Sequence, residues 1–440
     1  MSFKLFPHWV EKRNGVIAPD ERLPIGQTAL MGVQHVISMF GATVLAPLLM
    51  GFDPNVAILM SGVGTLLFFL LTHGQVPSYL GSSFAFIAPV GAATGYKIAS
   101  FMPNPNLAVA LGGIIACGVL YAAIGFLIKI IGHAWIEKLM PPVVTGSIVA
   151  VIGLNLASVA VMGAKDSNSN AWYMIMTVVC VALVSALTSG VLRRLLILFG
   201  LLSSTLFYGI FVNGLGWGVA GESGAKLIDF SKVNEAAWFG LPHFSTPTFD
   251  AAAMFIIAPI AVILVAENLG HLRAVQAMTG RDMGSRTGDA FIGDGLATML
   301  SGAVGGTGVT TYAENIGVMA VTKIYSTLAF VFAGFFAILL GFSPKMGALI
   351  QTIPGPVMGG ISIVVFGLIA VAGAKIWVDN HVDFSQNHNL IVAAVTLIIG
   401  AGDFGLAIGD LKLGGIGVAT FGAILLNALL KRAPKFDLID

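Results

Sequence analysis

The sequence predicts an all-α integral membrane protein built from two inverted halves, and three observations carry that prediction. Of the 440 residues, 57% are hydrophobic and 10% are charged, with a mean hydropathy of +0.92, whereas a soluble domain carries about 25% charged residues. Apolar stretches long enough to cross a bilayer, about 20 residues each, follow one another almost from end to end. One helix-like segment also recurs in the second half of the chain.

Fourteen apolar runs are candidate membrane spans. Some are short and rich in glycine, notably the third and the tenth. The only long polar gap is 214–250, so no appended soluble domain is expected. The expected spans are 28–51, 55–73, 79–97, 107–132, 139–162, 171–189, 193–213, 251–271, 284–303, 307–322, 324–342, 356–374, 389–403 and 413–430.

The distribution of Lys and Arg predicts the orientation, because cytoplasmic loops carry an excess of these residues. With both termini in the cytoplasm, 16 of the 22 Lys and Arg residues fall on the cytoplasmic side. Six fall outside: Lys97, Lys165, Lys226, Lys232, Lys345 and Lys412. We therefore expect an uncleaved cytoplasmic N-terminal segment, 1–27, a transmembrane domain, 28–430, and a cytoplasmic C-terminal tail, 431–440.

The repeated segment predicts that the transmembrane domain consists of two related halves. Pro142 and Gly153 in the fifth expected span recur as Pro356 and Gly367 in the twelfth, both at an offset of 214 residues. Spans seven apart enter the membrane in opposite directions, and inverted repeats of this kind are typical of transporters. The first repeat would cover about 28–213 and the second about 251–430.

Composition argues against several other classes of protein. The formal net charge of +1 suggests no nucleic-acid partner. The two cysteines, Cys117 and Cys180, both lie in apolar runs, which favours small core residues over a disulfide or a metal site. His271 has no second histidine at metal-ligand spacing, so neither a metal nor a cofactor is expected.

Two acidic residues lie within expected spans, where ionisable groups are costly and usually functional. Glu267 and His271 are four residues apart and share one helix face, near the end of the eighth run. Glu314 lies in the short tenth run, after a glycine-rich entry, and Gly81-Ser82-Ser83-Phe84 is similar to that entry in the first half. The alternative is that Glu267 and His271 are a buried pair that only holds helices together. Asp289 and Asp294 are expected to flank the ninth span in solvated or capping roles.

These groups together predict a site for a small planar ring. The two carboxylates accept hydrogen bonds, and backbone N–H groups at Phe84 and Ala313 donate them. Phe84 and Tyr312 supply an aromatic face. A neutral ring with two N–H donors and two carbonyl acceptors, such as uracil, complements this set, and a carboxylate or His271 is a candidate carrier of a coupling proton. Gln34 and His35 either neighbour this site or join helices.

The sequence resembles the nucleobase–ascorbate transporter family over about residues 25–430. Residues 314–323 (Glu-Asn-Ile-Gly-Val-Met-Ala-Val-Thr-Lys) are similar to the family signature, Gln34-His35 to its first-span motif, and Ala266-Glu267 with His271 to its eighth-span motif. Within the family, residues 18–24 and 307–327 are most similar to pyrimidine permeases.

The resemblance implies a proton-coupled symporter of the bacterial inner membrane that imports uracil, and thymine as a further pyrimidine. It implies fourteen spans in two inverted seven-span halves, core and gate domains, short β-strands in spans 3 and 10, and a homodimer. It assigns Glu267 and Glu314 to the substrate, His271 and Glu267 to proton coupling, and Asn315 to a supporting role. Phe366 stands where uracil permeases can carry a tyrosine, so a hydroxyl partner for His271 or the substrate is missing there.

Three alternatives stay open at this point. A xanthine or urate permease of the same family is the nearest, although such members often carry glutamine at the position of Glu314. An anion transporter of the same fold is disfavoured by the paired carboxylates. A membrane-embedded enzyme would need a nucleophile, a metal cluster or a phosphate-binding motif, and we find none in the sequence, so no enzymatic activity is expected.

Overall fold

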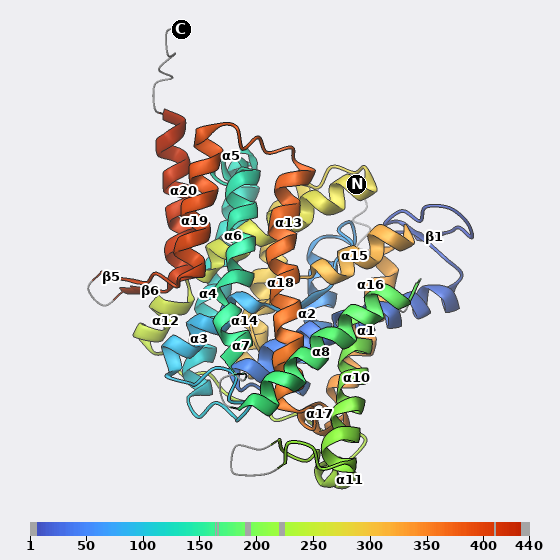
Figure 1. Ribbon diagram of the computed structural model, residues 1–440. Helices are drawn as coiled ribbons and strands as arrows, with labels where there is room; N and C mark the ends of the chain where they lie inside the picture. The colour runs from blue at the N-terminus through green and yellow to red at the C-terminus, as the bar shows by residue number, and fades with distance from the viewer. Residues whose placement is uncertain are drawn as a thin grey trace.

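The computed structural model describes residues 7–162, 164, 167–189, 195–219, 225–408 and 411–432, which form a largely helical protein (Figure 1). The helices are α1 (Ile25–Met50), α2 (Pro54–Leu71), α3 (Ile87–Thr94), α4 (Leu107–Ile131), α5 (Ala134–Leu139), α6 (Pro142–Asn155), α7 (Ala157–Met162), α8 (Asn168–Leu187), α10 (Leu196–Gly209), α11 (Ser231–Glu235), α12 (Ala251–Ile257), α13 (Ile260–Thr279), α14 (Thr287–Val304), α15 (Ala313–Thr322), α16 (Thr327–Gly341), α17 (Pro344–Gln351), α18 (Gly355–Asp379), α19 (Asn387–Ala401) and α20 (Gly415–Arg432). Short helical turns are η1 (Phe84–Phe86), η3 (Ile210–Gly214) and η4 (Gly284–Arg286). The strands are β1 (Val10–Glu11), β2 (Glu21–Arg22), β3 (Leu80–Ser82), β4 (Val309–Thr311), β5 (Leu406–Ile408) and β6 (Leu411–Leu413).

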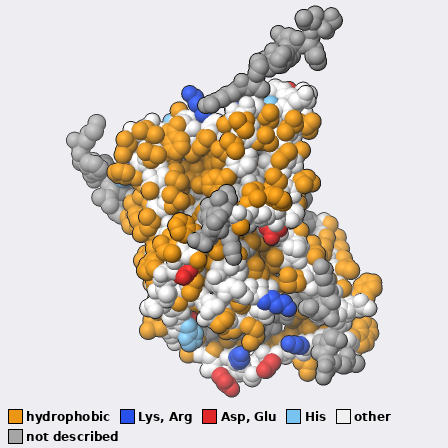
Figure 2. All heavy atoms as spheres, turned by 90° about the vertical axis from the view of Figure 1, so that its left-hand side faces the viewer, with side chains coloured by type: hydrophobic (Ala, Val, Ile, Leu, Met, Phe, Trp, Pro, Cys, Tyr) orange, Lys and Arg blue, Asp and Glu red, His pale blue; other side chains and the backbone are white. Residues whose placement is uncertain are grey.

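The prediction of a multi-pass membrane protein is confirmed. Within the described residues, eight helices are long and apolar enough to cross a bilayer, or nine if the bent pair α16 and α17, at 79° to each other, is one span. Hydrophobic side chains cover much of the face around α19 and α20, whereas charged side chains gather lower on the same view (Figure 2). Ile398, Leu425 and Leu429 are each more than half exposed there, as expected of residues that contact lipid.

The helices pack as two bundles. In the first bundle, α14 lies against α4 and α2, α16 against α2 and α1, and α12 and α13 against α4; α3 and α15 also belong to it. In the second, α18 lies against α6, α7, α8 and α10, and α19 and α20 lie against α6. The helix pair α6 and α18 is antiparallel, because Gly146 faces Gly373 while Gly153 faces Phe366 and Ala370. Glycine at these points lets the two backbones approach closely.

Strands β3 and β4 pair antiparallel inside the first bundle, with Leu80 opposite Thr311 and Ser82 opposite Val309. Both strands are buried. The backbone N–H of Tyr312 donates to the carbonyl of Tyr79 at 3.0 Å, and the N–H of Ser83 donates to that of Gly308 at 2.9 Å. Each strand leads directly into a helix, η1 and α3 after β3 and α15 after β4. The short strands implied by the family resemblance are therefore present in both places.

Several helices begin or end at other residues than the predicted spans. The eighth run does not end at 271, because α13 continues to Thr279. The fifth run is divided into α6 and α7, and the eighth into α12 and α13. The first helix begins at Ile25, three residues before the expected span. Residues 1–6, Lys165, Arg193, Arg194 and most of the expected tail, 433–440, lie outside the described residues.

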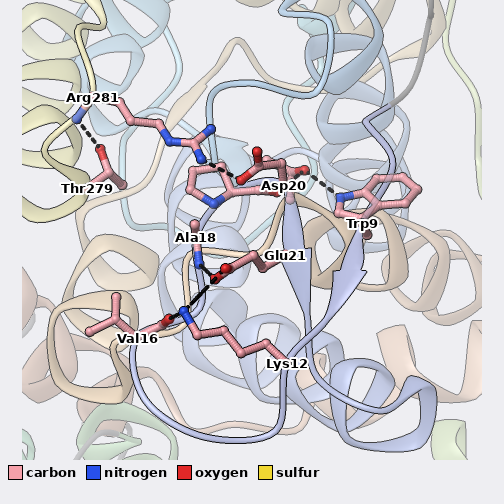
Figure 3. A network of polar contacts seen from close by, with 10 residues as sticks. Trp9, Lys12, Val16, Ala18, Asp20, Glu21, Thr279 and Arg281 are labelled. Atoms are coloured by element: carbon pink, nitrogen blue, oxygen red, sulfur yellow. Dashed lines mark hydrogen bonds and ion pairs between the residues drawn. The ribbon is translucent and has the colours of Figure 1, made fainter.

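The N-terminal loop, residues 7–24, is folded onto the first bundle. Ile17 is fully buried and forms two backbone hydrogen bonds with the segment between α15 and α16. Its N–H donates to the Lys323 carbonyl at 3.0 Å, and its carbonyl accepts from the Tyr325 N–H at 2.8 Å. The indole N–H of Trp9 donates to the Thr327 hydroxyl at 3.0 Å. Asp20 forms an ion pair with Arg281, just beyond α13 (Figure 3). The loop therefore joins the ends of the elements that carry Glu267 and Glu314.

Glu21 closes the N-terminal loop on itself. Its carboxylate accepts from the Ala18 N–H at 2.8 Å and from the Lys12 ammonium at 3.0 Å (Figure 3). The Ala18 N–H, followed by Lys12, lowers the pKa of Glu21 below its ordinary value of 4.5. A carboxyl whose pKa is lowered by folding stabilises the folded state above its ordinary pKa, and that contribution is lost as the pH falls through the lowered value.

We expect Glu21→Gln to reduce the free energy of unfolding by about 1 kcal/mol at neutral pH, because it replaces a charged acceptor of two hydrogen bonds. Thermal unfolding of the purified protein, followed between neutral pH and pH below 4, measures this difference. It should shrink in acid, where the wild-type carboxylate becomes protonated. The exposed Glu235→Gln is the matched control. An unchanged melting temperature for Glu21→Gln at neutral pH would contradict the assigned role.

Candidate functional site

A cavity of about 270 Å³ lies between the two bundles. Small-molecule pockets start at about 300 Å³, so this cavity suits a ligand of few atoms. Its polar wall comes from the first bundle and its apolar wall from α6, α10 and α18 of the second. The lining residues are Ile37, Ser38, Ser82, Ser83, Phe84, Val149, Leu195, Leu196, Ile197, Leu198, Glu267, His271, Thr310, Thr311, Tyr312, Ala313, Glu314, Val365, Leu368, Ile369 and Ala372.

The structure brings six of the predicted site residues together around this cavity: Phe84, Glu267, His271, Tyr312, Ala313 and Glu314. The four others, Gln34, His35, Asn315 and Phe366, are not among its described lining residues. None of the described lining residues is Lys or Arg. The cavity therefore presents two carboxyl groups and an imidazole without a cationic side chain from the described part of the chain.

Glu267 and His271 lie one turn apart in the middle of α13, and not near the end of the span as expected. The helix extends to Thr279 and ends at Gly280, whose left-handed backbone (φ 67°) closes it. One carboxyl oxygen of Glu267, Oε2, is buried and has no hydrogen-bond partner. An unpaired buried acceptor is costly, and no described residue offsets that cost at this oxygen.

Two helices begin at the cavity, each directly after one of the paired strands. Phe84 begins η1 and Ala313 begins α15, and neither backbone N–H has a partner among the described residues. The first N–H groups of a helix lack intrahelical acceptors, and the helix dipole makes this end electropositive. The turn that presents Ala313 is held by Tyr312, whose hydroxyl donates to the Ser82 carbonyl at 2.8 Å and accepts from Thr43 at 3.2 Å.

The supporting residues tie α1 to α15 behind the cavity. The Asn315 amide nitrogen donates to the His35 carbonyl at 3.0 Å and lies 3.1 Å from His35 Nδ1. The His35 ring is fully buried, with its centre 4.3 Å from that of Phe330. Gln34 makes no side-chain hydrogen bond to a described residue, and its amide nitrogen is buried. His35 and Asn315 thus hold the start of α15, and with it Glu314, against the first helix.

Phe366 offers no hydroxyl, and the structure shows what it does instead. Its ring packs edge to face on Phe84, with centres 5.6 Å apart and planes at 80°. The hydroxyl partner of His271 comes from another element: Thr311 Oγ1 lies 2.8 Å from His271 Nδ1. Sequence reasoning missed Thr311, although it directly precedes the predicted Tyr312.

Asp289 and Asp294 are both buried, so the expectation of solvated or capping roles was wrong. Asp289 forms ion pairs with Lys129 at 2.6 Å and Arg286 at 3.2 Å. Asp294 is fully buried within α14 and accepts from the Tyr121 hydroxyl at 3.3 Å and from the Asn268 amide. Asn268 directly follows Glu267, so Asp294 is a third acidic group beside the cavity wall. A Cβ at Gly293 would lie 3.0 Å from the Phe68 ring of α2, and one at Gly295 would lie 2.5 Å from the Ala122 backbone of α4, so these glycines allow close packing around Asp294.

These features define a membrane transporter of the class in which two half-helices meet at a central site. The same overall fold occurs in solved anion transporters of low sequence identity. The structure titled "The overall structure of SLC26A9" matches 93% of this chain and 66% of its own at a TM-score of 0.65 and 12% identity. The transmembrane domain of the cyanobacterial bicarbonate transporter BicA matches 92% of this chain and 97% of its own at a TM-score of 0.63 and 15% identity. At such identities the likeness concerns the fold alone.

The chain belongs to the Xan_ur_permease family, a permease family whose sequence model matches residues 26–408. It is a permease and not an enzyme. RutG of Escherichia coli (strain K12), which carries the name of a pyrimidine permease, is 64% identical over 97% of this chain and 96% of its own. Proteins named uracil permease from Paenibacillus larvae and Bacillus caldolyticus are 39% and 40% identical, over 97% and 96% of this chain and 98% and 96% of their own. The resemblance recognised from residues 314–323 is thereby confirmed.

The strand pairing that presents the site depends on glycine at position 81. A Cβ there would lie 2.4 Å from Cζ of Tyr312 and 2.7 Å from Oγ1 of Thr43, and both groups are hydrogen-bonded. We expect Gly81→Ala to lower the free energy of unfolding by about 1–3 kcal/mol, because overpacking forces rigid neighbours to move. Gly317→Ala is the matched control, since its Cβ would meet nothing within 4 Å. Thermal unfolding measures both, and equal melting temperatures for the two variants would refute the close approach.

Proposed function

We propose that the chain is a proton-coupled symporter that imports uracil, with thymine as a further pyrimidine substrate. The observation that carries the proposal is the cavity in which Glu267 and Glu314 face unpaired N–H groups of two helix starts. The names of the relatives, uracil permease and pyrimidine permease, support the same substrate class.

The cavity has the donors and acceptors that a uracil ring needs. The carboxyl groups of Glu267 and Glu314 accept hydrogen bonds from the ring N–H groups, and the backbone N–H groups of Phe84 and Ala313 donate to its carbonyl oxygens. Phe84 and Tyr312 offer apolar ring faces at the same wall. A ligand that satisfies all four groups is favoured over one that leaves any of them buried and unpaired.

Proton coupling requires that substrate affinity differ between two protonation states of the site. Glu267 and His271 are the candidate proton carriers, because both line the cavity and lie one turn apart on α13. A carboxylate accepts from a ring N–H, whereas a protonated carboxyl also presents a donor. A proton bound at Glu267 therefore changes how well the cavity matches uracil.

An anion substrate is disfavoured, although the solved structures with the same fold include a bicarbonate transporter. The described cavity residues contribute two acidic groups and no Lys or Arg. A xanthine or urate permease of the same family is the remaining alternative. The acidic Glu314 favours a pyrimidine, because members with those substrates often carry glutamine at this position.

For the architecture we propose fourteen spans in two inverted halves, about 28–213 and 251–430, with the first bundle as the core domain and the second as the gate domain. The antiparallel pairs β3–β4 and α6–α18 support the inversion, since each joins corresponding elements of the two halves. The excess of Lys and Arg supports cytoplasmic termini, and the bacterial relatives support the inner membrane. A homodimer is part of the proposal on the family resemblance alone.

Uptake of radiolabelled uracil into proteoliposomes, with and without an inward proton gradient, tests this function. We expect accumulation that the gradient drives and that unlabelled uracil competes away. Cytosine should compete poorly, because its N3 is an acceptor where the site requires a donor. Uptake of xanthine in place of uracil, or uptake indifferent to the gradient, would refute the substrate or the coupling.

Glu314→Gln should fold normally and reduce uracil uptake by about tenfold or more, because it replaces a charged acceptor at the substrate by an amide. Glu267→Gln should weaken uracil binding and make the remaining uptake insensitive to the proton gradient. Glu235→Gln, exposed on α11 outside the cavity, is the control and should match the wild type. Wild-type accumulation by both cavity variants would remove Glu267 and Glu314 from the site.

A further inference from the structure

The hydrogen bond between His271 and Thr311 joins two elements that are distant in the sequence. His271 Nδ1, from the middle of α13, lies 2.8 Å from Thr311 Oγ1 at the end of β4. The Thr311 backbone is a second hydrogen-bond partner of the same imidazole, and no other described residue hydrogen-bonds either side chain. Both residues line the cavity. This contact therefore determines how the imidazole is presented there.

Thr311 is a fixed partner because β4 is held on both sides. Val309 in the same strand exchanges hydrogen bonds with the Thr298 hydroxyl of α14, at 3.2 Å through its N–H and 3.1 Å through its carbonyl. Tyr312, which follows Thr311, donates hydrogen bonds to the carbonyl groups of Tyr79 and Ser82. Successive side chains of a strand point to opposite faces. Accordingly, Thr311 meets α13, whereas the hydroxyl of the adjacent Thr310 is buried without any partner.

Nδ1 of His271 is thus engaged by Thr311, whereas Nε2 makes no hydrogen bond to a described residue. A hydroxyl bound to Nδ1 opposes rotation of the ring. The hydrogen bond at one ring nitrogen also sets which of the two nitrogens carries the proton. Phe366 cannot take this role, because its ring is packed on Phe84.

We propose that Thr311 is a positioning residue that holds the imidazole of His271 in one orientation and one tautomer, with Nε2 toward the cavity shared by Glu267 and Glu314. The effect on transport rests on the function proposed above, whereas the effect on the tautomer does not. Thr311 itself contacts His271 and acts on the substrate through it.

Three variants separate the hydroxyl from the shape of the side chain. Thr311→Val keeps the volume and branching of threonine and removes the hydroxyl, Thr311→Ser keeps the hydroxyl, and Thr310→Val removes the unpartnered neighbour in the same strand. The first readout is ¹⁵N NMR of histidine-labelled protein, with the His271 signals assigned by their loss in His271→Gln. The second readout is the kinetics of radiolabelled uracil uptake.

In the wild type, Thr311→Ser and Thr310→Val, we expect one tautomer of His271. In Thr311→Val we expect signals that report a mixture or the other tautomer. Uptake by Thr311→Val should show an apparent KM raised about tenfold, the size of one lost hydrogen bond, with a normal melting temperature and rescue in Thr311→Ser.

The outcomes are distinguishable. An unchanged tautomer in Thr311→Val overturns the proposal, whatever the transport result. A mixture of His271 tautomers in Thr310→Val as well as in Thr311→Val also overturns it, because the change would then reflect the strand and not the contact with His271. If the wild type takes up no uracil, the proposed function fails, and the NMR comparison still decides whether Thr311 holds His271.

Discussion

The pairing of two three-residue strands, β3 and β4, is the constraint on which the rest of the structure depends. Inside a bilayer, every backbone polar group has to find a partner within the protein, and non-helical backbone is tolerated only where it is buried or lines a cavity. Each strand precedes a helix, and the two strands satisfy each other through the backbone bonds around Tyr79, Ser83, Gly308 and Tyr312. The non-helical backbone leaves the first N–H groups of η1 and α15 at the cavity without a partner among the described residues.

The two bundles contribute different kinds of side chain to the cavity, and this difference affects which bundle can move. Its polar groups belong to the first bundle, whereas the second bundle contributes apolar side chains such as Val149, Val365 and Leu368. Apolar contacts are non-directional, so the second bundle can change its position without breaking hydrogen bonds at the site. In the first bundle, by contrast, hydrogen bonds join the elements: those between His35 and Asn315 behind the cavity, and those of the N-terminal loop at the end of the bundle.

The ionisable residues of the site were predictable because they are exceptions in an apolar sequence. Glu267 and Glu314 stand out in runs that otherwise lack charge, and the glycine-rich entries before Phe84 and Ala313 indicated broken helices. Asp294 was expected to flank a span, whereas the structure buries it inside α14, next to Gly295, whose Cβ would lie 2.5 Å from the Ala122 backbone of α4. Thr311 was not predicted, because a threonine in an apolar run does not indicate a role unless the partner of its hydroxyl is known.

The sequence by itself determined the membrane environment and singled out Glu267 and Glu314, the two acidic residues that line the cavity, because hydropathy and charge are properties of individual segments. Only the tertiary structure decided which groups meet. Residues 84, 267, 271 and 314 come together through strand pairing and helix packing between segments far apart in the chain, which no local pattern encodes. The same holds for the bond from Thr311 to His271. It also holds for the N-terminal loop, which the sequence predicted only as a cytoplasmic segment and which folds onto the bundle that carries the site.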